Sequence, residues 1–155
     1  MLCMQATLVY ASEPGELAPT FYLTDLSGND FFASRVYGDK AKEPSAVVFS
    51  FFATWCIPCR AEVPQLEILS QEFPEIQFYL VSVKDPEEKI LKWLNDLKVE
   101  LPVLVDKYGN TAKKFNVIGE GDAGQEVASL PSLFIIDKSG TIIYQHTGYK
   151  AGDEI

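Results

Sequence analysis

The sequence is poor in the residues that build metal centres, with 3 Cys and 1 His among 155 residues. A structural zinc site takes about four Cys or His ligands, usually arranged as two pairs. Cys56 and Cys59 form one close pair, but Cys3 and His146 lie far from that pair and from each other in the sequence. The counts therefore argue against a zinc site, and we expect no metal and no cofactor.

Basic residues are also few: 13 Lys and Arg stand against 22 Asp and Glu, which gives a formal net charge of -9. So acidic a chain is a poor match for nucleic acid or for anionic lipid, because both bind basic surfaces. Long apolar runs are missing too, since none reaches the roughly 18 residues of a membrane span. We therefore expect no membrane-spanning segment, and a partner that is a protein or a small molecule.

The length fits one domain, and an apolar fraction of 47% is enough for one packed core over residues 13–155. Residues 1–12 are uncharged and mostly apolar, and Val9-Tyr10-Ala11 has the small-residue pattern that ends a secretory signal, although a basic start is missing. Two interpretations stay open. The segment is either the signal remnant of a periplasmic or otherwise extracytoplasmic protein, or an apolar segment that packs on the domain, in which case a cytoplasmic location is the alternative.

What the chain does have is two cysteines at a short spacing. Trp55-Cys56-Ile57-Pro58-Cys59 follows an apolar strand-like run and opens a predicted helix. Unpaired backbone N–H groups at a helix N-terminus favour a thiolate, so Cys56 is the expected nucleophile. Cys59, one helical turn further on, can close a small disulfide and release a mixed disulfide with a partner. A purely structural disulfide is the alternative, but a loop this short constrains little of the unfolded chain.

Patterns along the chain predict an α/β domain. Strands are expected at 46–52, 76–83, 101–105, 132–136 and 141–146, with a hairpin between about 21 and 32. Helices are expected at 57–72, after Asp85 and at 111–115. Because helices connect the earlier strands, we expect those strands to pair in parallel, and the last two strands to form a hairpin. The predicted sheet is therefore mixed, with helices on both sides.

Two connecting segments are predicted from local signals. Asp85-Pro86-Glu87-Glu88 is typical of a helix start, with a capping Asp, Pro at the first helical position and acids in the first turn. Residues 118–129 carry three glycines among acidic side chains. We interpret this second segment as a loop, because glycine interrupts regular structure.

The stretch Phe51 to Arg60 resembles the active-site strand and helix start of the thioredoxin superfamily. Pro64 matches the kink proline of that helix, and Leu130-Pro131-Ser132 resembles the segment whose cis-proline faces the dithiol. The resemblance covers residues 18–148 and is strongest to the TlpA-like and ResA-like branch. It implies a thioredoxin-like fold, in which a central mixed β-sheet is flanked by helices and carries an N-terminal hairpin and an inserted strand and helix.

Three features favour that branch. They are the Ala18-Pro19-x-Phe21 entry followed by Leu26-x-Gly28, the added strand and helix, and Glu62 three residues after Cys59. In that branch the matching acid tunes the proton chemistry of the thiols. Ser50 stands where thioredoxins proper keep a buried acid, so Glu62 is the candidate for the proton of Cys59. An ordinary exposed acid in the first helical turn is the alternative.

The resemblance also implies a substrate-binding surface made by Trp55, Ile57, Pro58, Leu130 and Pro131. A cis-proline exposes the backbone before it for strand-like pairing with an extended substrate. The implied partners are proteins that carry a disulfide or a dithiol, and a membrane electron donor that recharges an extracytoplasmic reductant. The motif itself sets neither the redox potential nor the direction of electron flow.

Three departures from the family pattern carry expectations. Leu130 stands in place of the common Thr, Val or Ile, which should alter substrate packing. Residues 118–129 are longer than usual and either shape the partner groove or form a solvated insertion. Only seven residues follow Gly148, too few for the helix that normally covers one sheet face, so we expect that face to be met by the N-terminal segment or by a second subunit.

Two other functions compete with disulfide exchange. Peroxiredoxins resemble the chain in fold and entry, but their Pro-x-x-x-Thr-x-x-Cys pocket is missing, because Phe49 and Ala53 occupy the Pro and Thr positions before Cys56. A binding module is the other alternative, in which the groove at Trp55 and Pro131 holds a partner without turnover. Loss of insulin reduction in a Cys56→Ser variant would separate the enzyme from the module.

Overall fold

The computed structural model describes residues 13–150 and 152. The two interpretations of residues 1–12 therefore lie outside the described residues. Among the residues that are described, no helix is both long enough and apolar enough to cross a membrane.

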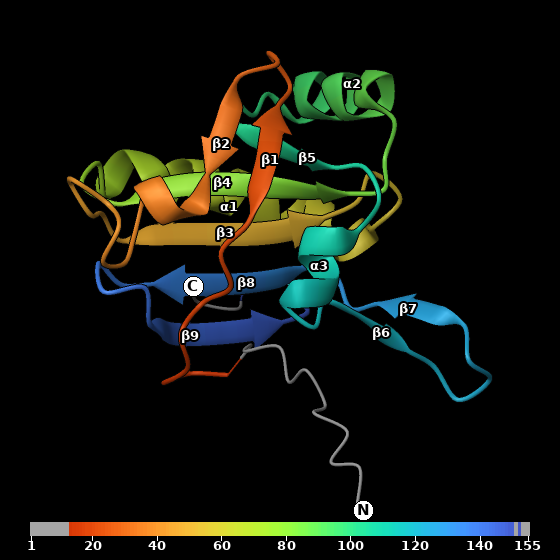
Figure 1. Ribbon diagram of the computed structural model, residues 1–155. Helices are drawn as coiled ribbons and strands as arrows, with labels where there is room; N and C mark the ends of the chain where they lie inside the picture. Colours follow the sequence, from red (N-terminus) through yellow and green to blue (C-terminus); the bar gives the residue numbers. More distant parts are fainter. Residues whose placement is uncertain (1–12, 151, 153–155) are drawn as a thin grey trace, which may run out of the picture.

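A seven-stranded mixed sheet forms the centre of the molecule (Figure 1). From one edge to the other its strands are β2 (Asp30–Phe32), β1 (Tyr22–Asp25), β5 (Val103–Asp106), β4 (Gln77–Val83), β3 (Val47–Phe52), β8 (Ser132–Ile136) and β9 (Ile142–Thr147). The pairs β3–β4 and β4–β5 are parallel, and all other pairs in this sheet are antiparallel. The predicted mixed sheet with a C-terminal hairpin at one edge is confirmed, and the predicted N-terminal hairpin forms the other edge.

Helices cover both faces of the sheet, as predicted. The helices α1 (Ile57–Glu72) and α2 (Glu87–Leu97) bury side chains in one apolar cluster, and α3 (Asn110–Lys114) and the 3-10 helix η1 (Ala33–Arg35) bury side chains in the other. The segment from α2 through β5 to α3 is inserted between β4 and the cis-proline. This arrangement places β3 inside the sheet, between β4 and β8, and covers it on both faces.

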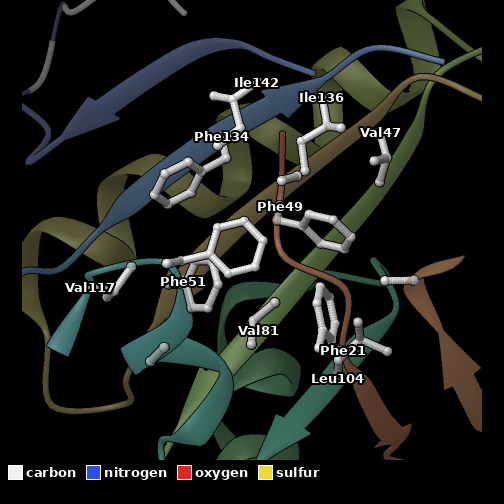
Figure 2. Close-up of a cluster of buried hydrophobic side chains, with 14 of the residues drawn as sticks. Phe21, Val47, Phe49, Phe51, Val81, Leu104, Val117, Phe134, Ile136 and Ile142 are labelled. Atoms are coloured by element: carbon white, nitrogen blue, oxygen red, sulfur yellow. The ribbon is translucent and has the colours of Figure 1, made fainter. Parts of the chain in front are cut away.

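Strand β3 joins the two clusters, because successive side chains of a strand point to opposite faces. Val47, Phe49 and Phe51 belong to the cluster on the α3 side, which Figure 2 shows. Val48 and Phe52 belong to the cluster on the α1 side. Every residue of β3 is buried, and each buried Phe contributes about 2 kcal/mol of transfer free energy. The strand that leads to Cys56 is thus held rigidly from both sides.

The segment at 118–129, predicted to be a loop, contains a second small sheet. Strands β6 (Ile118–Glu120) and β7 (Glu126–Ala128) pair antiparallel, and Figure 1 shows this hairpin projecting from the body of the molecule. Gly124, with φ of 77°, lies in the turn of the hairpin, and Gly121 donates its N–H to the carbonyl of Gln125 at 2.7 Å. The prediction was wrong because these glycines form the turn and leave the flanking residues free to pair.

The start of α2 also differs from the prediction. The helix begins at Glu87, Pro86 is its N-cap, and no side chain caps it. Asp85 is not the cap, because its carboxylate accepts hydrogen bonds from Thr54. A donor 31 residues away in the chain has replaced the local partner that the pattern predicts.

The edge of β9 is lined by the chain that enters the domain. Gly15 donates its N–H to the carbonyl of Ile142, and Ala18 donates to Gly140, each at 2.8 Å. On β9 itself Ile143 and Tyr144 are exposed, Ile143 by 56%. What covers this part of the sheet in solution stays a prediction.

Candidate active site

The two cysteines lie where β3 ends and α1 begins. Cys56 is the N-cap of α1, with extended backbone angles (φ -81°, ψ 110°), and its N–H donates to the carbonyl of Ala53 at 3.0 Å. The Sγ atom of Cys56 accepts a hydrogen bond from the N–H of Cys59 at 3.3 Å. The two sulfurs form a disulfide. The prediction of a first sulfur at a helix N-terminus and its partner one turn further on is therefore confirmed.

Exposed apolar side chains surround this buried disulfide. Trp55 is 67% exposed and Ile57 is 80% exposed, and Pro58 is exposed as well. Both sulfur-bearing residues are buried in the cluster on the α1 side. Large apolar side chains in contact with water are a common mark of a surface that binds another protein. The three residues flanking Cys56 are therefore free to contact a partner.

The second part of the predicted surface comes from the two residues that precede β8. The peptide bond between Leu130 and Pro131 is cis, as the family resemblance implied. Leu130 is half-buried and packs against the cluster that includes both cysteines, and Pro131 is buried. The carbonyl of Pro131 accepts the N–H of Gly148 at 2.8 Å. The structure therefore packs Leu130 against the apolar cluster that holds both cysteines, from a segment more than 70 residues further along the chain.

Glu62 is a buried acid beneath the dithiol. It lies on the inward face of α1 with Cys59, Val63 and Leu66, and it is only 2% exposed. Burial raises the pKa of this carboxyl to about 7, although the hydrogen bond from Ser50 works in the opposite direction. An acid with such a pKa exchanges protons near neutral pH. The alternative of an ordinary exposed acid is wrong.

Ser50 gives Glu62 its hydrogen-bonding partner. The Ser50 hydroxyl donates to Oε1 of Glu62 at 2.6 Å, and Ser50 is itself fully buried on β3. From the sequence, Ser50 was notable only because it stands where thioredoxins proper keep an acid on this strand. In the structure a buried acid reaches the Ser50 hydroxyl from α1, so the pair joins β3 to α1.

Sequence reasoning missed Thr54 and Asp85. The carboxylate of Asp85 accepts the N–H of Thr54 at 2.6 Å and the Thr54 hydroxyl at 2.9 Å. Thr54 lies two residues before Cys56, in the turn between β3 and α1. No local pattern reports a contact between these two residues. The only available signal was that each follows a strand, and that β3 and β4 were predicted to be parallel neighbours.

The β6–β7 hairpin lines a pocket next to Trp55. The pocket has a volume of about 270 Å³, and its other lining residues are Val83, Lys84, Ile118, Glu126 and Ala128. Glu126 forms ion pairs with Lys113 and Lys84. The hydrogen bond from Lys113 and then that from Lys84 lower the pKa of Glu126 to about 2. The segment that precedes the cis-proline is therefore attached to the body of the domain beside the dithiol.

The described part of the chain contains no group of three or more His, Cys, Asp or Glu side chains placed to hold a metal ion. The chemistry available to the dithiol, the buried acid and the exposed apolar rim is thiol chemistry and proton transfer.

The model of the AhpC/TSA family matches residues 14–145. The chain belongs to the AhpC/TSA family. Among its relatives in this fold, the thioredoxin-like protein YneN of Bacillus subtilis is 30% identical over 140 residues, which are 88% of this chain and 72% of that protein. The thiol-disulfide oxidoreductase ResA of Bacillus thuringiensis is 26% identical over 145 residues, 92% of this chain and 75% of that protein.

A solved structure supports the same relationship. The crystal structure of a protein assigned as the thiol:disulfide interchange protein DsbE of Chlorobium tepidum matches with a TM-score of 0.73 and 25% identity, over 90% of this chain and 89% of that one. The thioredoxin-like fold and the resemblance to the ResA-like branch are confirmed. The chain is a thiol-disulfide oxidoreductase, and Cys56 and Cys59 form its redox pair.

Proposed function

We propose that this enzyme reduces disulfides in protein partners outside the cytoplasm. The thiolate of Cys56 attacks one sulfur of the partner's disulfide, and the other partner sulfur leaves as a thiolate. The thiolate of Cys59 then attacks Sγ of Cys56, so that the second partner sulfur leaves. Two electrons pass to the partner, its two thiolates take up protons, and the enzyme is left with the Cys56–Cys59 disulfide.

One observation carries the proposal. Sγ of Cys56 lies at the N-terminus of α1 and accepts the N–H of Cys59. Backbone N–H groups and the helix dipole stabilise negative charge at that position, which lowers the pKa of a thiol placed there. This favours Cys56 as the sulfur that attacks the partner's disulfide, and Cys59 later attacks that same Cys56 sulfur to release the partner.

Glu62 is proposed to handle the proton of Cys59. A thiol must lose its proton before it attacks a disulfide. Glu62 lies one helical turn from Cys59 on the same buried face of α1, and its pKa of about 7 suits a base near neutral pH. Water has little access to a fully buried Cys59, so a nearby carboxylate is the natural acceptor.

The partner is proposed to bind as an extended segment across the exposed rim. Trp55, Ile57 and Pro58 offer exposed apolar contacts next to Cys56. Leu130, in the segment before β8, offers its side chain and the backbone next to its cis bond with Pro131. Backbone pairing gives affinity for an extended chain, and apolar contacts select its side chains. These five residues are the candidates for substrate binding.

The extracytoplasmic location rests on the pattern in residues 1–12, where small residues end an uncharged apolar segment. An enzyme that reduces partners there must regain two electrons after each turnover. The proposed source is a membrane protein that carries a dithiol, which would exchange with the Cys56–Cys59 disulfide by the same chemistry.

Insulin reduction tests the proposed function. The wild-type enzyme, supplied with dithiothreitol, should reduce insulin disulfides, and Cys56→Ser should abolish the reaction. Cys59→Ser, reduced first and then freed of dithiothreitol, should accumulate a mixed disulfide between Cys56 and the substrate, because the resolving thiol is missing. Retained binding without turnover in the wild type would favour the binding module instead. Consumption of hydrogen peroxide by the wild type would favour a peroxidase, although buried Phe49 and Ala53 replace the usual pocket residues.

A further inference from the structure

The turn before Cys56 is tied to the next strand of the sheet by one carboxylate. Asp85 is 8% exposed and accepts both the N–H of Thr54, at 2.6 Å, and the hydroxyl of Thr54, at 2.9 Å. Hydrogen bonds to an ionised acceptor are roughly twice as strong as neutral ones, and the two bonds together fix the direction of Thr54. Since β3 and β4 are parallel and paired up to Phe52 and Ser82, residues that follow them meet at one edge of the sheet.

The same turn sets the position of the attacking sulfur. Besides the bonds at Thr54, the N–H of Cys56 donates to the carbonyl of Ala53 at 3.0 Å. Thr54 and Cys56 are separated by one residue, so their Cα atoms are at most about 7 Å apart. A movement of Thr54 therefore carries the backbone of Cys56, and with it the Sγ atom that accepts the N–H of Cys59.

Backbone strain marks the β4–α2 corner, formed by Lys84 and Asp85. Lys84 has a φ of 58°, and among the described residues only two other non-glycine residues, Lys98 and Asn116, have positive φ. Both of those follow helices, where the left-handed conformation is common. Lys84 follows a strand instead. Strained residues of this kind persist where the surrounding structure uses them, often at active sites.

The two residues of the β4–α2 corner make contacts with two different segments near Trp55. The Lys84 side chain forms an ion pair with Glu126 of the β6–β7 hairpin, and the next side chain, Asp85, bonds to Thr54. Trp55 and the hairpin line the same pocket. The strained β4–α2 corner thus directs Lys84 to the β6–β7 hairpin and Asp85 to the turn that carries Cys56.

We propose that Asp85 is a positioning residue for the exchange reaction, which through Thr54 holds the Cys56 sulfur at the N-terminal amides of α1. The inference rests on the proposed role of Cys56 as the attacking sulfur. Removing the Thr54 hydroxyl weakens the hold on the turn, so Sγ spends less time near the amides that stabilise its negative charge. The pKa of Cys56 then rises, and exchange near neutral pH slows.

Thr54→Val is the informative variant because it changes no charge. Asp85 lines a pocket together with four charged residues, Lys84, Glu87, Glu88 and Lys107. A variant that removed the charge of Asp85 would therefore also change its electrostatic interactions with these neighbours. The pH dependence of iodoacetamide alkylation at Cys56 in the reduced enzyme, mapped by mass spectrometry, should shift to higher pH. The rate at pH 7 should fall with the thiolate fraction, approaching tenfold for each further pH unit once the pKa lies above 7, and should recover at alkaline pH. Thr54→Ser should restore the wild-type profile.

Repeating the Thr54 substitution in an Asp85→Ala protein tests whether the effect on Cys56 depends on Asp85. Thr54→Val should raise the pKa of Cys56 in the wild type and leave it unchanged in the Asp85→Ala background, since the bond is already lost there. An equal shift in both backgrounds, or a wild-type profile in Thr54→Val, would overturn the proposal. If Thr54→Val does not fold, Thr54→Ala, which removes the same hydroxyl, is used in its place.

Asp106→Asn is the matched control. Asp106 is also a buried carboxylate at the end of a parallel strand, but its side chain accepts the N–H of Ala112 in α3, at 2.8 Å, and not a donor of the turn before Cys56. The control should lower the stability and leave the alkylation profile as it is. The insulin assay is read separately: an inactive wild type rejects the proposed function, whereas the alkylation profile alone decides the role of Asp85.

Discussion

Glu62 shows how burial changes the chemistry of one side chain. Its carboxyl is enclosed by apolar residues on α1 and β3 and keeps one hydrogen-bond donor, Ser50. Loss of water penalises the ionised form more than one hydrogen bond can repay, so the pKa rises from 4.5 to about 7. A group whose pKa is raised in the folded state stabilises the fold below its unfolded pKa, and this contribution is lost as the pH rises through the folded value.

For this reason the oxidised protein should become less stable between about pH 4.5 and pH 7, the interval set by the two pKa values of Glu62. The loss amounts to about 3 kcal/mol, from 1.36 kcal/mol per pH unit. Glu62→Gln stays neutral and should remove this slope. Urea unfolding at pH 5, 6, 7 and 8 measures the effect, as the difference between variant and wild type at each pH.

Ser50→Ala supplies the opposite control. Its hydroxyl favours the ionised form of Glu62, so its removal should raise the pKa of Glu62 further and steepen the loss of stability above neutral pH. Parallel pH profiles for Glu62→Gln and the wild type would contradict the assignment of the slope to Glu62.

At the scale of single residues, the spacing of Cys56 and Cys59 at a helix start predicted the redox pair, whereas Glu62 was singled out by the family resemblance and its role stays a proposal. Sequence reasoning did not identify the partner of Ser50 or the contact between Thr54 and Asp85. Both contacts join side chains on different elements. Which donor meets which acceptor across such a gap depends on strand order and register, and no local pattern encodes these.

The β6–β7 hairpin is held to the domain by charge. Its two strands place Glu120 directly opposite Glu126, and like charges in that position repel each other. Lys84, which follows β4, and Lys113 of α3 both pair with Glu126 and offset the repulsion. The hairpin therefore depends on two cations supplied by other elements, although both pairs are exposed and are screened by salt.

Glu126→Gln should loosen this hairpin without unfolding the domain. Backbone amides at 118–128 should exchange hydrogen for deuterium faster, while those of β3 keep their wild-type rates, because the substitution removes the attachment and leaves the core intact. Hydrogen exchange followed by mass spectrometry measures both regions in one experiment. High salt should produce the same change in the wild type.

Glu120→Gln is the control on the same hairpin, because it removes the opposing acid and keeps both lysine pairs. We expect slower exchange in this variant. Faster exchange in Glu120→Gln, or unchanged exchange in Glu126→Gln, would show that the ion pairs do not hold the hairpin.

Among the elements, α1 and β3 were predictable from the sequence, and the hairpin was not. The bounds of α1 match the prediction at Ile57 and Glu72, since the motif marks its start and apolar spacing continues through it. Strand β3 is apolar throughout because both of its faces are covered. The strands of the hairpin are three residues long and carry opposed acids, so their pairing depends on contacts that the segment itself does not contain.

The molecule as a whole is stabilised by two apolar clusters, one on each face of the sheet. The disulfide adds little to this, because it links residues only three apart in the sequence. Closing so short a loop removes little entropy from the unfolded chain, about 2 kcal/mol at most. A bond that contributes little to stability can be opened and closed in each turnover while the fold persists.

Reduction with dithiothreitol should therefore lower the free energy of unfolding by no more than about 2 kcal/mol. Guanidinium unfolding of the oxidised and the reduced protein, with equal m-values, gives this difference. The Cys56→Ser, Cys59→Ser double variant should behave like the reduced protein. A loss above roughly 5 kcal/mol would identify the bond as a structural disulfide and would contradict the exchange role.

The sequence by itself determined the α/β class, the mixed sheet with its terminal hairpins, and the cysteine pair at the start of a helix. Each of these follows from short-range spacing, because hydrophobic period, turn residues and helix starts are properties of neighbouring residues. Only the tertiary structure decided that Glu62 is buried against Ser50, that Asp85 holds the turn before Cys56, and that residues 118–128 pair beside Trp55. These contacts depend on which strands lie side by side, and that is settled only when the whole chain packs.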